Sequence, residues 1–307
     1  MKILMLYARD QYTTARHFEN AIRRTKEFQF LGVGFTKQGL ASVQGDNAWI
    51  PSGQEIVITD LLTKLPARPD VIIAMQGFTH MKVYGLESID IPTVYYGIDT
   101  HMVKDMIFDE AKNYKHVFFA QKKAIPEFKE FCGKESHWLP CCAEPIIHKP
   151  MDFKEEYDFA FVGGVDMSEA HKSRRDAIMK LKEKYKVFVG NAYGYFMTMQ
   201  YNKAKVVFNY AVNDDLNMRV FEAMACKRPL LTNKLSLQSG LSDLFKDGEH
   251  YIGFDDKDLM EKAEMLIKDK ALRDKIALSG YNETIKNHTY TKRLEDLWKE
   301  VRTSKQQ

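Results

Sequence analysis

The segment Asp214–Cys226 carries acidic side chains in a pattern that suits ligand binding. It reads DDLNMRVFEAMAC, which predicts a polar loop that leads into a helix over Arg219–Ala225. Glu222 then falls in the first helical turn, where the helix dipole favours a carboxylate. Glu222 is either a surface residue that complements this dipole or a carboxylate that accepts both hydroxyls of a ribose. Asp214 stands eight residues before it.

A glycine pair suggests a second binding segment. Gly163 and Gly164 directly follow a predicted strand, and a helix that starts with basic residues comes next. Glycines let a backbone approach a ligand closely, and the N–H groups at a helix start suit anions. The segment is either a tight turn with a solvated helix face or a diphosphate site. Its basic residues are Lys172, Arg174 and Arg175.

In the first half of the chain, Asp99 and His101 follow the predicted strand Thr93–Gly97. The carboxyl edge of a parallel sheet is where α/β proteins bind ligands. Both residues are therefore candidates for a binding cleft, although a lone histidine is more often structural. Gly77 and His80 occupy an equivalent place after an earlier strand.

Several cofactor classes are disfavoured. A dinucleotide fold has G-x-G-x-x-G after its first strand, but Leu6–Phe18 contains no glycine. The four cysteines show no C-x-x-C spacing, so we expect reduced thiols and no structural zinc. No D-x-D motif stands at a strand end where a sugar-nucleotide metal ion would be expected.

Composition bounds the class of protein. The 307 residues are 45% hydrophobic and 28% charged, enough for about two domains with sizeable cores. The net charge of +3 is spread along the chain, without the basic block of a nucleic-acid arm. No apolar run approaches the roughly 20 residues that span a bilayer, and the opening MKILMLYARD reads as a strand. A cytoplasmic location is expected.

Short apolar runs alternate with amphipathic segments, which predicts βα units around parallel sheets. In the first half the predicted strands are Lys2–Tyr7, Phe30–Phe35, Val71–Met75, Thr93–Gly97 and Val117–Ala120, and the predicted helices are Thr13–Phe28 and Ala124–Phe131. In the second half the strands are Asp158–Val162, Lys186–Val189, Val206–Asn209 and Pro229–Thr232. The helices there are Arg174–Lys184, Arg219–Ala225, Asp258–Lys268, Ala271–Asn287 and Lys292–Val301.

A proline-rich segment separates the two halves. Trp138–Pro150 contains Pro140, Pro145 and Pro150, which exclude a continuous helix or a central strand. We therefore expect domains over 1–145 and 146–285, with a helix over 286–307 that packs back on the first domain.

The chain resembles GT-B glycosyltransferases, specifically the spore-maturation CgeB-like branch of the family 4-type (glycosyl transferases group 1) enzymes, over nearly its full length. The segments that carry the resemblance are Pro92–His101, His116–Phe128, Trp138–Pro150, Asp215–Asn233, Gly240–Phe254 and Asn287–Arg293. This resemblance implies an α/β fold of two Rossmann-like domains that face a cleft, with the acceptor bound by the first and a nucleotide-sugar by the second.

The resemblance also implies roles for individual residues. Glu222 matches the glutamate that holds the ribose. Asp214 matches the acidic residue that contacts the donor sugar, where the wider family usually has glutamate, so Asn217 or Arg219 can share this contact. For the diphosphate, the resemblance implies Arg174 or Arg175 together with the glycine turn, and the loop of Leu237, Gly240 and Leu241, whose backbone amides would face the phosphates. Tyr193 is either a ring that stacks on the base or a buried aromatic.

The implied reaction is transfer from a UDP- or GDP-sugar with retention, without a metal or other cofactor. Asp99 or His101 would orient or deprotonate the acceptor, which is a glycan, a protein, a lipid-linked sugar or a modified nucleic-acid base. Two alternatives remain: a non-catalytic nucleotide- or glycan-binding protein and a GT-B sugar-nucleotide epimerase. Asp214 favours the first, as does Lys227, which stands where relatives often have glycine.

Overall fold

A computed structural model of the chain describes residues 1–8, 13–35, 55–77 and 81–303, so His80 lies outside the described residues. The chain forms two compact units, Met1–Pro140 with Tyr290–Gln307 and Cys141–Thr289. The divisions fall at 140/141 and 289/290, against the predicted 145/146 and 285/286. None of the helices in the described ranges combines the length and the apolar character needed to cross a membrane.

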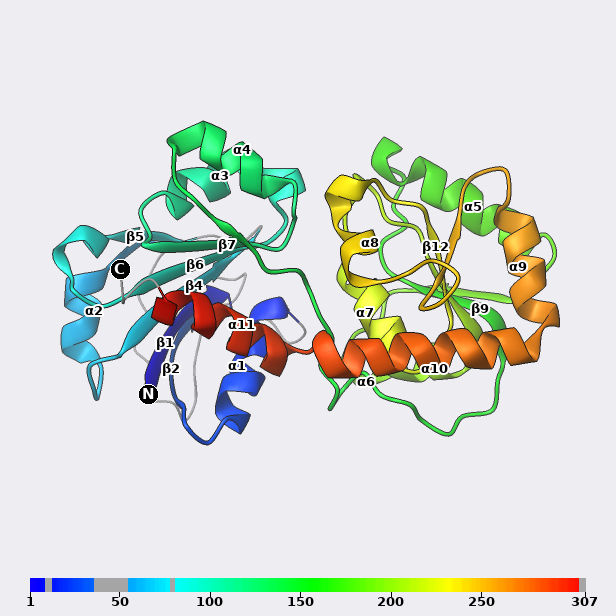
Figure 1. The fold of residues 1–307 in the computed structure, drawn as a ribbon, viewed down its shortest axis with the longest axis horizontal. Helices are drawn as coiled ribbons and strands as arrows, with labels where there is room; N and C mark the ends of the chain where they lie inside the picture. The colour runs from blue at the N-terminus through cyan, green and yellow to red at the C-terminus, as the bar shows by residue number, and fades with distance from the viewer. Residues whose placement is uncertain (9–12, 36–54, 78–80, 304–307) are drawn as a thin grey trace. The chain divides into compact units, whose positions relative to one another are not determined.

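The first unit is built on a six-stranded parallel sheet in the order β2-β1-β4-β6-β7-β8 (Figure 1). All six residues of β4 are buried, as expected of a strand with helices on both faces. A parallel pair, β3 with β5, forms a separate small sheet. The strands are β1 (Lys2–Ala8), β2 (Gln29–Phe35), β3 (Glu55–Val57), β4 (Val71–Gln76), β5 (Lys82–Tyr84), β6 (Thr93–Gly97), β7 (His116–Phe119) and β8 (His137–Trp138).

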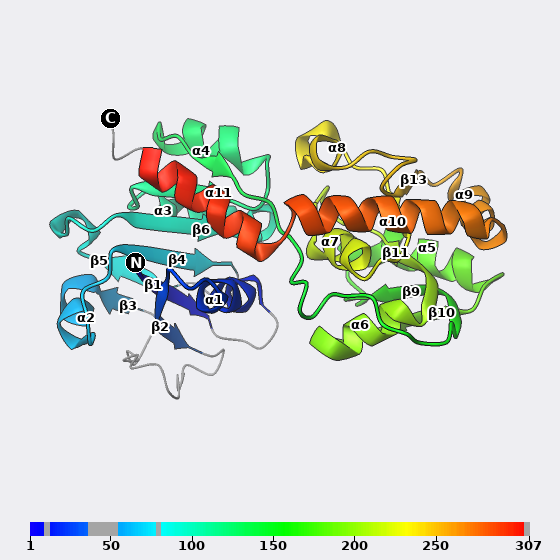
Figure 2. The ribbon, with the colours of Figure 1, turned by 60° about the horizontal axis from the view of Figure 1, so that its bottom comes forward.

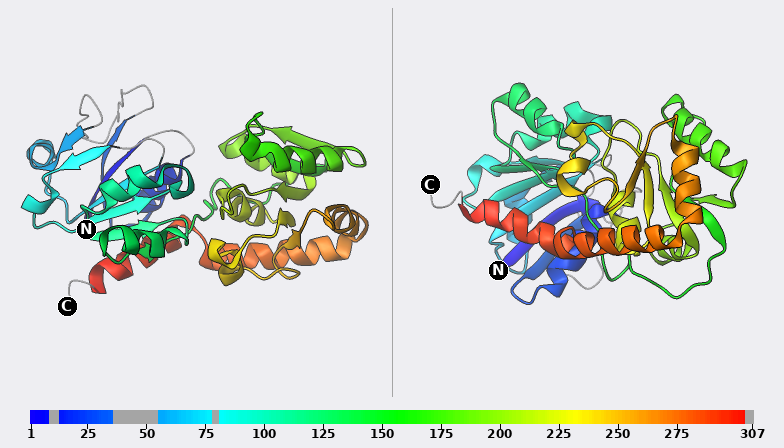
Figure 3. Two further views of the ribbon diagram at one scale, coloured as in Figure 1. Left: turned by 90° about the horizontal axis from the view of Figure 1, so that it is seen from above. Right: turned by 45° about the vertical axis from the view of Figure 1, so that its right-hand side comes forward.

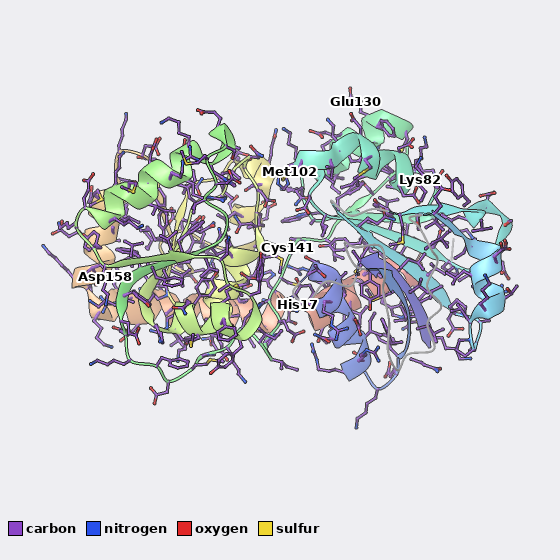
Figure 4. All side chains as sticks on the ribbon, turned by 180° about the vertical axis from the view of Figure 1, so that it is seen from behind. His17, Lys82, Met102, Glu130, Cys141 and Asp158 are labelled. Atoms are coloured by element: carbon purple, nitrogen blue, oxygen red, sulfur yellow. The ribbon has the colours of Figure 1, made fainter. Side chains whose placement is uncertain are left out.

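Helices cover both faces of this sheet. One face packs against α2 (Ile58–Lys64), α3 (Thr100–Ala111) and α4 (Ala124–Cys132). On the other face α1 (Thr14–Arg24), which carries the His17 labelled in Figure 4, lies beside α11 (Tyr290–Thr303). The ring of His17 is 5.0 Å from that of Tyr290. The predicted helix Thr13–Phe28 is too long, because Thr25 adopts an extended backbone and ends α1.

The second unit contains a five-stranded parallel sheet in the order β10-β9-β11-β12-β13 (Figure 2). This order reverses direction between β9 and β11, and α/β proteins bind ligands outside the carboxyl ends of the strands at such a switch point. The strands are β9 (Tyr157–Val162), β10 (Val187–Gly190), β11 (Ala204–Asn209), β12 (Leu230–Asn233) and β13 (Ile252–Phe254).

The helices of the second unit also form two layers. α5 (Lys172–Lys182) and α9 (Leu259–Lys268) pack on the face that carries Phe159, Phe161 and Phe208. α6 (Gly194–Asn202) and α7 (Met218–Ala225) pack against β9, β11 and β12 on the opposite face, and α10 (Lys270–Asn287) lies against α7 (Figure 3). The short helix α8 (Leu241–Leu244) follows β12. The starts of α5 and α7 lie close to the switch point, because Arg174 and Arg219 in their first turns donate hydrogen bonds to carbonyls at or just after the end of β9.

Candidate functional site

Arg219, in the first turn of α7, bridges the two strands of the switch point. Its Nε donates to the carbonyl of Val162 at the end of β9 (2.7 Å), and its Nη1 donates to Oδ1 of Asn209 at the end of β11 (2.5 Å). Its guanidinium lies 4.4 Å from the centre of the Phe161 ring. The strand edge thus holds a fixed cation.

Arg174, in the first turn of α5, brings a second cation to the same ring. Its Nε donates to the carbonyl of Tyr210 (2.9 Å) and its Nη1 to that of Gly164 (2.7 Å). Its guanidinium lies 5.4 Å from the Phe161 ring, and the residue is only 5% exposed. Burial and the positive charge of Arg219 lower the pKa of Arg174 to about 10. Two guanidinium groups on one ring at a switch point favour an anion as ligand.

Gly163 makes this arrangement possible. It has a φ of +154°, and a Cβ at this position would lie 2.1 Å from Nη2 of Arg219. A Cβ at Gly164 would meet Cε1 of His171 at 3.6 Å, an ordinary contact. Gly163 therefore gives room to Arg219, a reason that the spacing of the glycines did not reveal.

Arg175 points to a different place from Arg174. Its Nη1 donates to the carbonyls of Asp166 and Ser168, the latter at 2.8 Å, and so holds the loop between β9 and α5. Of the two adjacent arginines, only Arg174 bonds to the carbonyls at the ends of β9 and β11.

Glu222 lies in α7, one helical turn beyond Arg219. The prediction that it falls in the first helical turn is wrong, because α7 begins at Met218 and has no acidic residue in that turn. Glu222 is instead 7% exposed, and burial raises its pKa to about 7, although Arg219 opposes the shift. It is not a surface carboxylate that complements a dipole.

His148 is a neighbour of Glu222 that the sequence did not identify. Its Nε2 lies 3.8 Å from Oε1 of Glu222, and the residue is 1% exposed. Its Nδ1 accepts the N–H of Glu144 (3.1 Å). His148 lies in the proline-rich segment, whose composition indicated only a linker.

Asn217 and Asp214 lie on the loop before α7. Nδ2 of Asn217 donates to Oδ1 of Asn209 (3.4 Å), while its own buried Oδ1 accepts no hydrogen bond from residues in the described ranges. Asp214 has a left-handed backbone with φ 57°, and its carboxylate accepts from both the N–H (2.8 Å) and the hydroxyl of Ser236. Asp214 thereby joins its own loop to the loop that follows β12.

The loop after β12 turns at Gly240, which has a φ of 83°. Ser236 begins a short 3-10 helix over Leu237–Ser239, and Oγ of Ser239 accepts the N–H of Leu241 (3.2 Å). The amide of Leu241 is thus engaged within this loop.

Tyr193 precedes α6 and is 62% exposed, so the alternative of a buried aromatic is wrong. Tyr195 and Phe196 beside it are also exposed, and their rings meet edge to face with centroids 6.2 Å apart. Tyr193 follows the carboxyl end of β10, the strand next to β9.

Asp99 and His101 lie in the first unit, at the carboxyl edge of its sheet. Asp99 has a left-handed backbone with φ 60° between β6 and α3, and His101 is half-buried in the first turn of α3. A Cβ at Gly77, after the adjacent strand β4, would lie 2.9 Å from Oδ2 of Asp99. The structure therefore brings Asp99 and Gly77 together.

The described part of the chain contains no group of three or more histidine, cysteine, aspartate or glutamate side chains arranged to hold a metal ion. The second unit does gather Arg174, Arg219, Asn217 and Glu222 from the predicted residues around the end of β9 and the start of α7.

Comparisons with solved structures show the fold. An α-glucosyltransferase solved with UDP and a 13-mer DNA containing an HMU base is 14% identical, with a TM-score of 0.70 over 98% of this chain and 99% of that one. HepE from Anabaena, solved with UDP and glucose, is 10% identical, with a TM-score of 0.65 over 99% and 100%. Sucrose-phosphate synthase from Thermosynechococcus elongatus is 11% identical, with a TM-score of 0.62 over 99% and 100%.

No curated protein sequence matches the chain significantly. A family model described as glycosyl transferase-like matches residues 146–299, which include the second-unit residues described above. The chain therefore belongs to the glycosyl transferase-like family and has the α/β fold of GT-B glycosyltransferases.

Proposed function

We propose that this protein transfers a sugar from a nucleoside-diphosphate sugar to an acceptor, and that it belongs to the CgeB-like branch of its family. The observation that carries the proposal is the pair of guanidinium groups, Arg174 and Arg219, on the Phe161 ring at the switch point. A diphosphate leaving group needs charge stabilisation, and preorganised arginines supply it. The family match and the GT-B fold support the same reaction.

In this proposal Arg174 and Arg219 bind the diphosphate and Glu222 accepts the ribose hydroxyls. Asn217 contacts the donor sugar, because its buried Oδ1 is an acceptor that no hydrogen bond from the described residues uses. Asp214 already binds Ser236, but a carboxylate has about four acceptor sites, so it can take a sugar hydroxyl as well. Gly240 and its loop approach the phosphates.

The exposed ring of Tyr193 stacks on the base. UDP is the first nucleotide to test, since two of the structural neighbours were solved with UDP. Transfer with retention and without a metal is part of the same proposal, as is acceptor activation by Asp99 or His101 in the first unit. Exposed loops after strands are where such enzymes read their acceptors.

Thermal unfolding with UDP, GDP and ADP tests the donor site. A ligand at 100 times its dissociation constant stabilises the folded state by about 2.7 kcal/mol, which raises the melting temperature by several degrees. We expect this rise with UDP, with or without magnesium. It should disappear in Glu222→Ala and Arg174→Met and persist in Arg175→Met, the matched control for charge. No rise with any nucleotide would contradict the proposal.

Turnover separates transfer from binding alone. The bond of Asp214 to Ser236 also suits a protein that binds a nucleotide without transferring its sugar. UDP release from UDP-glucose or UDP-N-acetylglucosamine should depend on an added acceptor if the protein is a transferase. Nucleotide binding without acceptor-dependent release across a panel of glycans and proteins would favour the binding function.

A further inference from the structure

The pair formed by His148 and Glu222 suggests a role for His148 that rests on the proposed function. His148 belongs to the segment before β9, and Glu222 to α7. Both side chains are buried, and Nε2 of His148 lies 3.8 Å from Oε1 of Glu222. This distance is just beyond a direct hydrogen bond, and such contacts often shorten when a substrate binds.

The hydrogen bonding of His148 determines which proton it offers. Nδ1 accepts the N–H of Glu144 at 3.1 Å, so Nδ1 carries no proton and the neutral ring has its proton on Nε2. Nε2 is the ring nitrogen that lies 3.8 Å from Oε1 of Glu222. Protonating Nδ1 as well would break its bond to Glu144, so the proton on the side of Glu222 is the one on Nε2.

The segment that holds His148 is itself fastened to α6. Oγ1 of Thr198 donates to the carbonyl of Ile147 (3.0 Å), and Nδ2 of Asn202 donates to that of Lys149 (3.0 Å). The backbone on both sides of His148 is therefore held by α6, which limits how far the His148 side chain can move from Glu222.

The described residues place other titratable groups around this pair. Arg219 on the same helix attracts the Glu222 carboxylate. Tyr201 on α6 and Cys226 at the end of α7 also face it, and burial raises the pKa of both, so they stay neutral near pH 7. Beside His148, the Glu144 carboxylate accepts the N–H of Ile146 (3.3 Å). Within this set, burial raises the pKa of Glu222 to about 7.

We propose that His148 is a positioning residue for nucleotide binding, which orients Glu222 through its Nε2–H and favours the ionised carboxylate that accepts the ribose hydroxyls. Binding then requires loss of the Glu222 proton, so nucleotide affinity rises with pH until the carboxylate is fully ionised. Burial raises the pKa of Glu222 to about 7, which puts this rise between about pH 6 and 8.

The test compares His148→Leu, which has no donor, with His148→Gln, which keeps a neutral N–H donor. UDP binding is measured by calorimetry from pH 5.5 to 8.5. Loss of a hydrogen bond to a charged group changes an equilibrium constant by roughly tenfold or more, so His148→Leu should bind UDP at least about tenfold more weakly at pH 7. The midpoint of its affinity profile should also move to higher pH, while His148→Gln should follow the wild type.

Two controls separate the possible failures. Glu222→Gln cannot ionise, so its remaining pH dependence reports the groups other than Glu222, which include the phosphates of UDP. The carboxyl titration of Glu222, followed by ¹³C NMR without ligand and identified by its loss in Glu222→Gln, should move to higher pH in His148→Leu. If the wild type binds no UDP, the proposed function fails and this titration still tests the pair. The role of His148 would be overturned if folded His148→Leu kept the wild-type midpoints of UDP affinity and of the Glu222 titration. It would also be overturned if His148→Gln behaved like His148→Leu.

Discussion

Replacing Gly163 with alanine should dislodge the guanidinium of Arg219. The added Cβ would lie 2.1 Å from Nη2 and 3.2 Å from Cζ of Arg219, well inside van der Waals contact. Because Nη2 is the terminal nitrogen of a long side chain, Arg219 moves more readily than the backbone of the strand end does. The guanidinium then leaves the carbonyl of Val162, Oδ1 of Asn209 and the face of the Phe161 ring.

The size of this effect follows from the interactions of Arg219. A hydrogen bond from a charged donor contributes about 1.5–3 kcal/mol, but water replaces part of each bond because Arg219 is half-buried. The backbone of Gly163, with φ at +154°, adds strain of about 1–3 kcal/mol for alanine. We expect Gly163→Ala to lower the free energy of unfolding by about 2–5 kcal/mol, several degrees in melting temperature.

Urea and thermal unfolding measure this loss, with Gly164→Ala as the matched control for stability. The Cβ at Gly164 meets only an ordinary 3.6 Å contact with His171, so its unfolding free energy should change by no more than about 0.5 kcal/mol. UDP affinity should also fall in Gly163→Ala, because one of the two cations has moved. Equal stability of the two variants, or UDP affinity of Gly163→Ala equal to that of the wild type, would refute the reasoning.

Two further predictions concern stability. Lys227 is the left-handed residue of a Schellman motif after α7. Lys227→Gly should relieve about 1–2 kcal/mol of backbone strain, and this gain exceeds the loss of about 0.4–1 kcal/mol from the greater entropy of the unfolded chain, so the melting temperature should rise slightly. Lys227→Ala keeps the strain and should not raise the melting temperature. Glu110 is buried, accepts the N–H of Val83, and has a pKa raised to about 7 by burial. Since this folded-state pKa exceeds the unfolded one, up to about 3 kcal/mol of stability is lost as pH rises from about 4.5 to 7, and Glu110→Gln should flatten that part of the urea-unfolding profile; an unchanged slope would contradict the assignment.

The longer central strands were predictable because they are buried on both faces, whereas the strands of two or three residues, β3, β5, β8 and β13, were not predicted. The predicted strand Val71–Met75 corresponds to β4, in which every residue is buried, and consecutive apolar residues are the signal of such a strand. The order of the strands does not follow from their composition. The switch point between β9 and β11 could therefore be identified only from the structure.

Four helices in the described part of the chain were not predicted, namely α2, α3, α6 and the short α8, and two of them show the physical reason. α3 has non-helical angles at Val103, with φ at −136°, so its apolar residues do not keep one helical period. α6 buries Thr198 and Asn202, whose polar groups bind the backbone of the segment before β9. A buried helix face that contains polar residues gives no amphipathic signal.

Residue types identified members of the candidate site, but not their surroundings. Glu222 was named from a helix start, although it lies beyond the first turn of α7, and Arg174 was named together with Arg175 from the glycine turn. Both Glu222 and Arg174 are buried. The pairing of Gly163 with Arg219 was not predictable, because it joins residues far apart in sequence through the missing side chain of one of them. The place of His148 in the site was not predictable either, because it depends on its contact with Glu222, which lies in another element.

The arrangement of charges explains why an anion should stabilise this unit as well as bind to it. Arg174 and Arg219 repel one another across Phe161, and burial adds a desolvation cost to Arg174, both of which lower its pKa. Asp166 and Asp215 offset these effects only in part. Because like charges at a partly buried site destabilise the folded state, a bound diphosphate would remove that repulsion in addition to forming its own hydrogen bonds. We therefore expect added salt to reduce the stability gained from UDP less steeply than it reduces the stability contributed by surface ion pairs, since salt screens partly buried charges less.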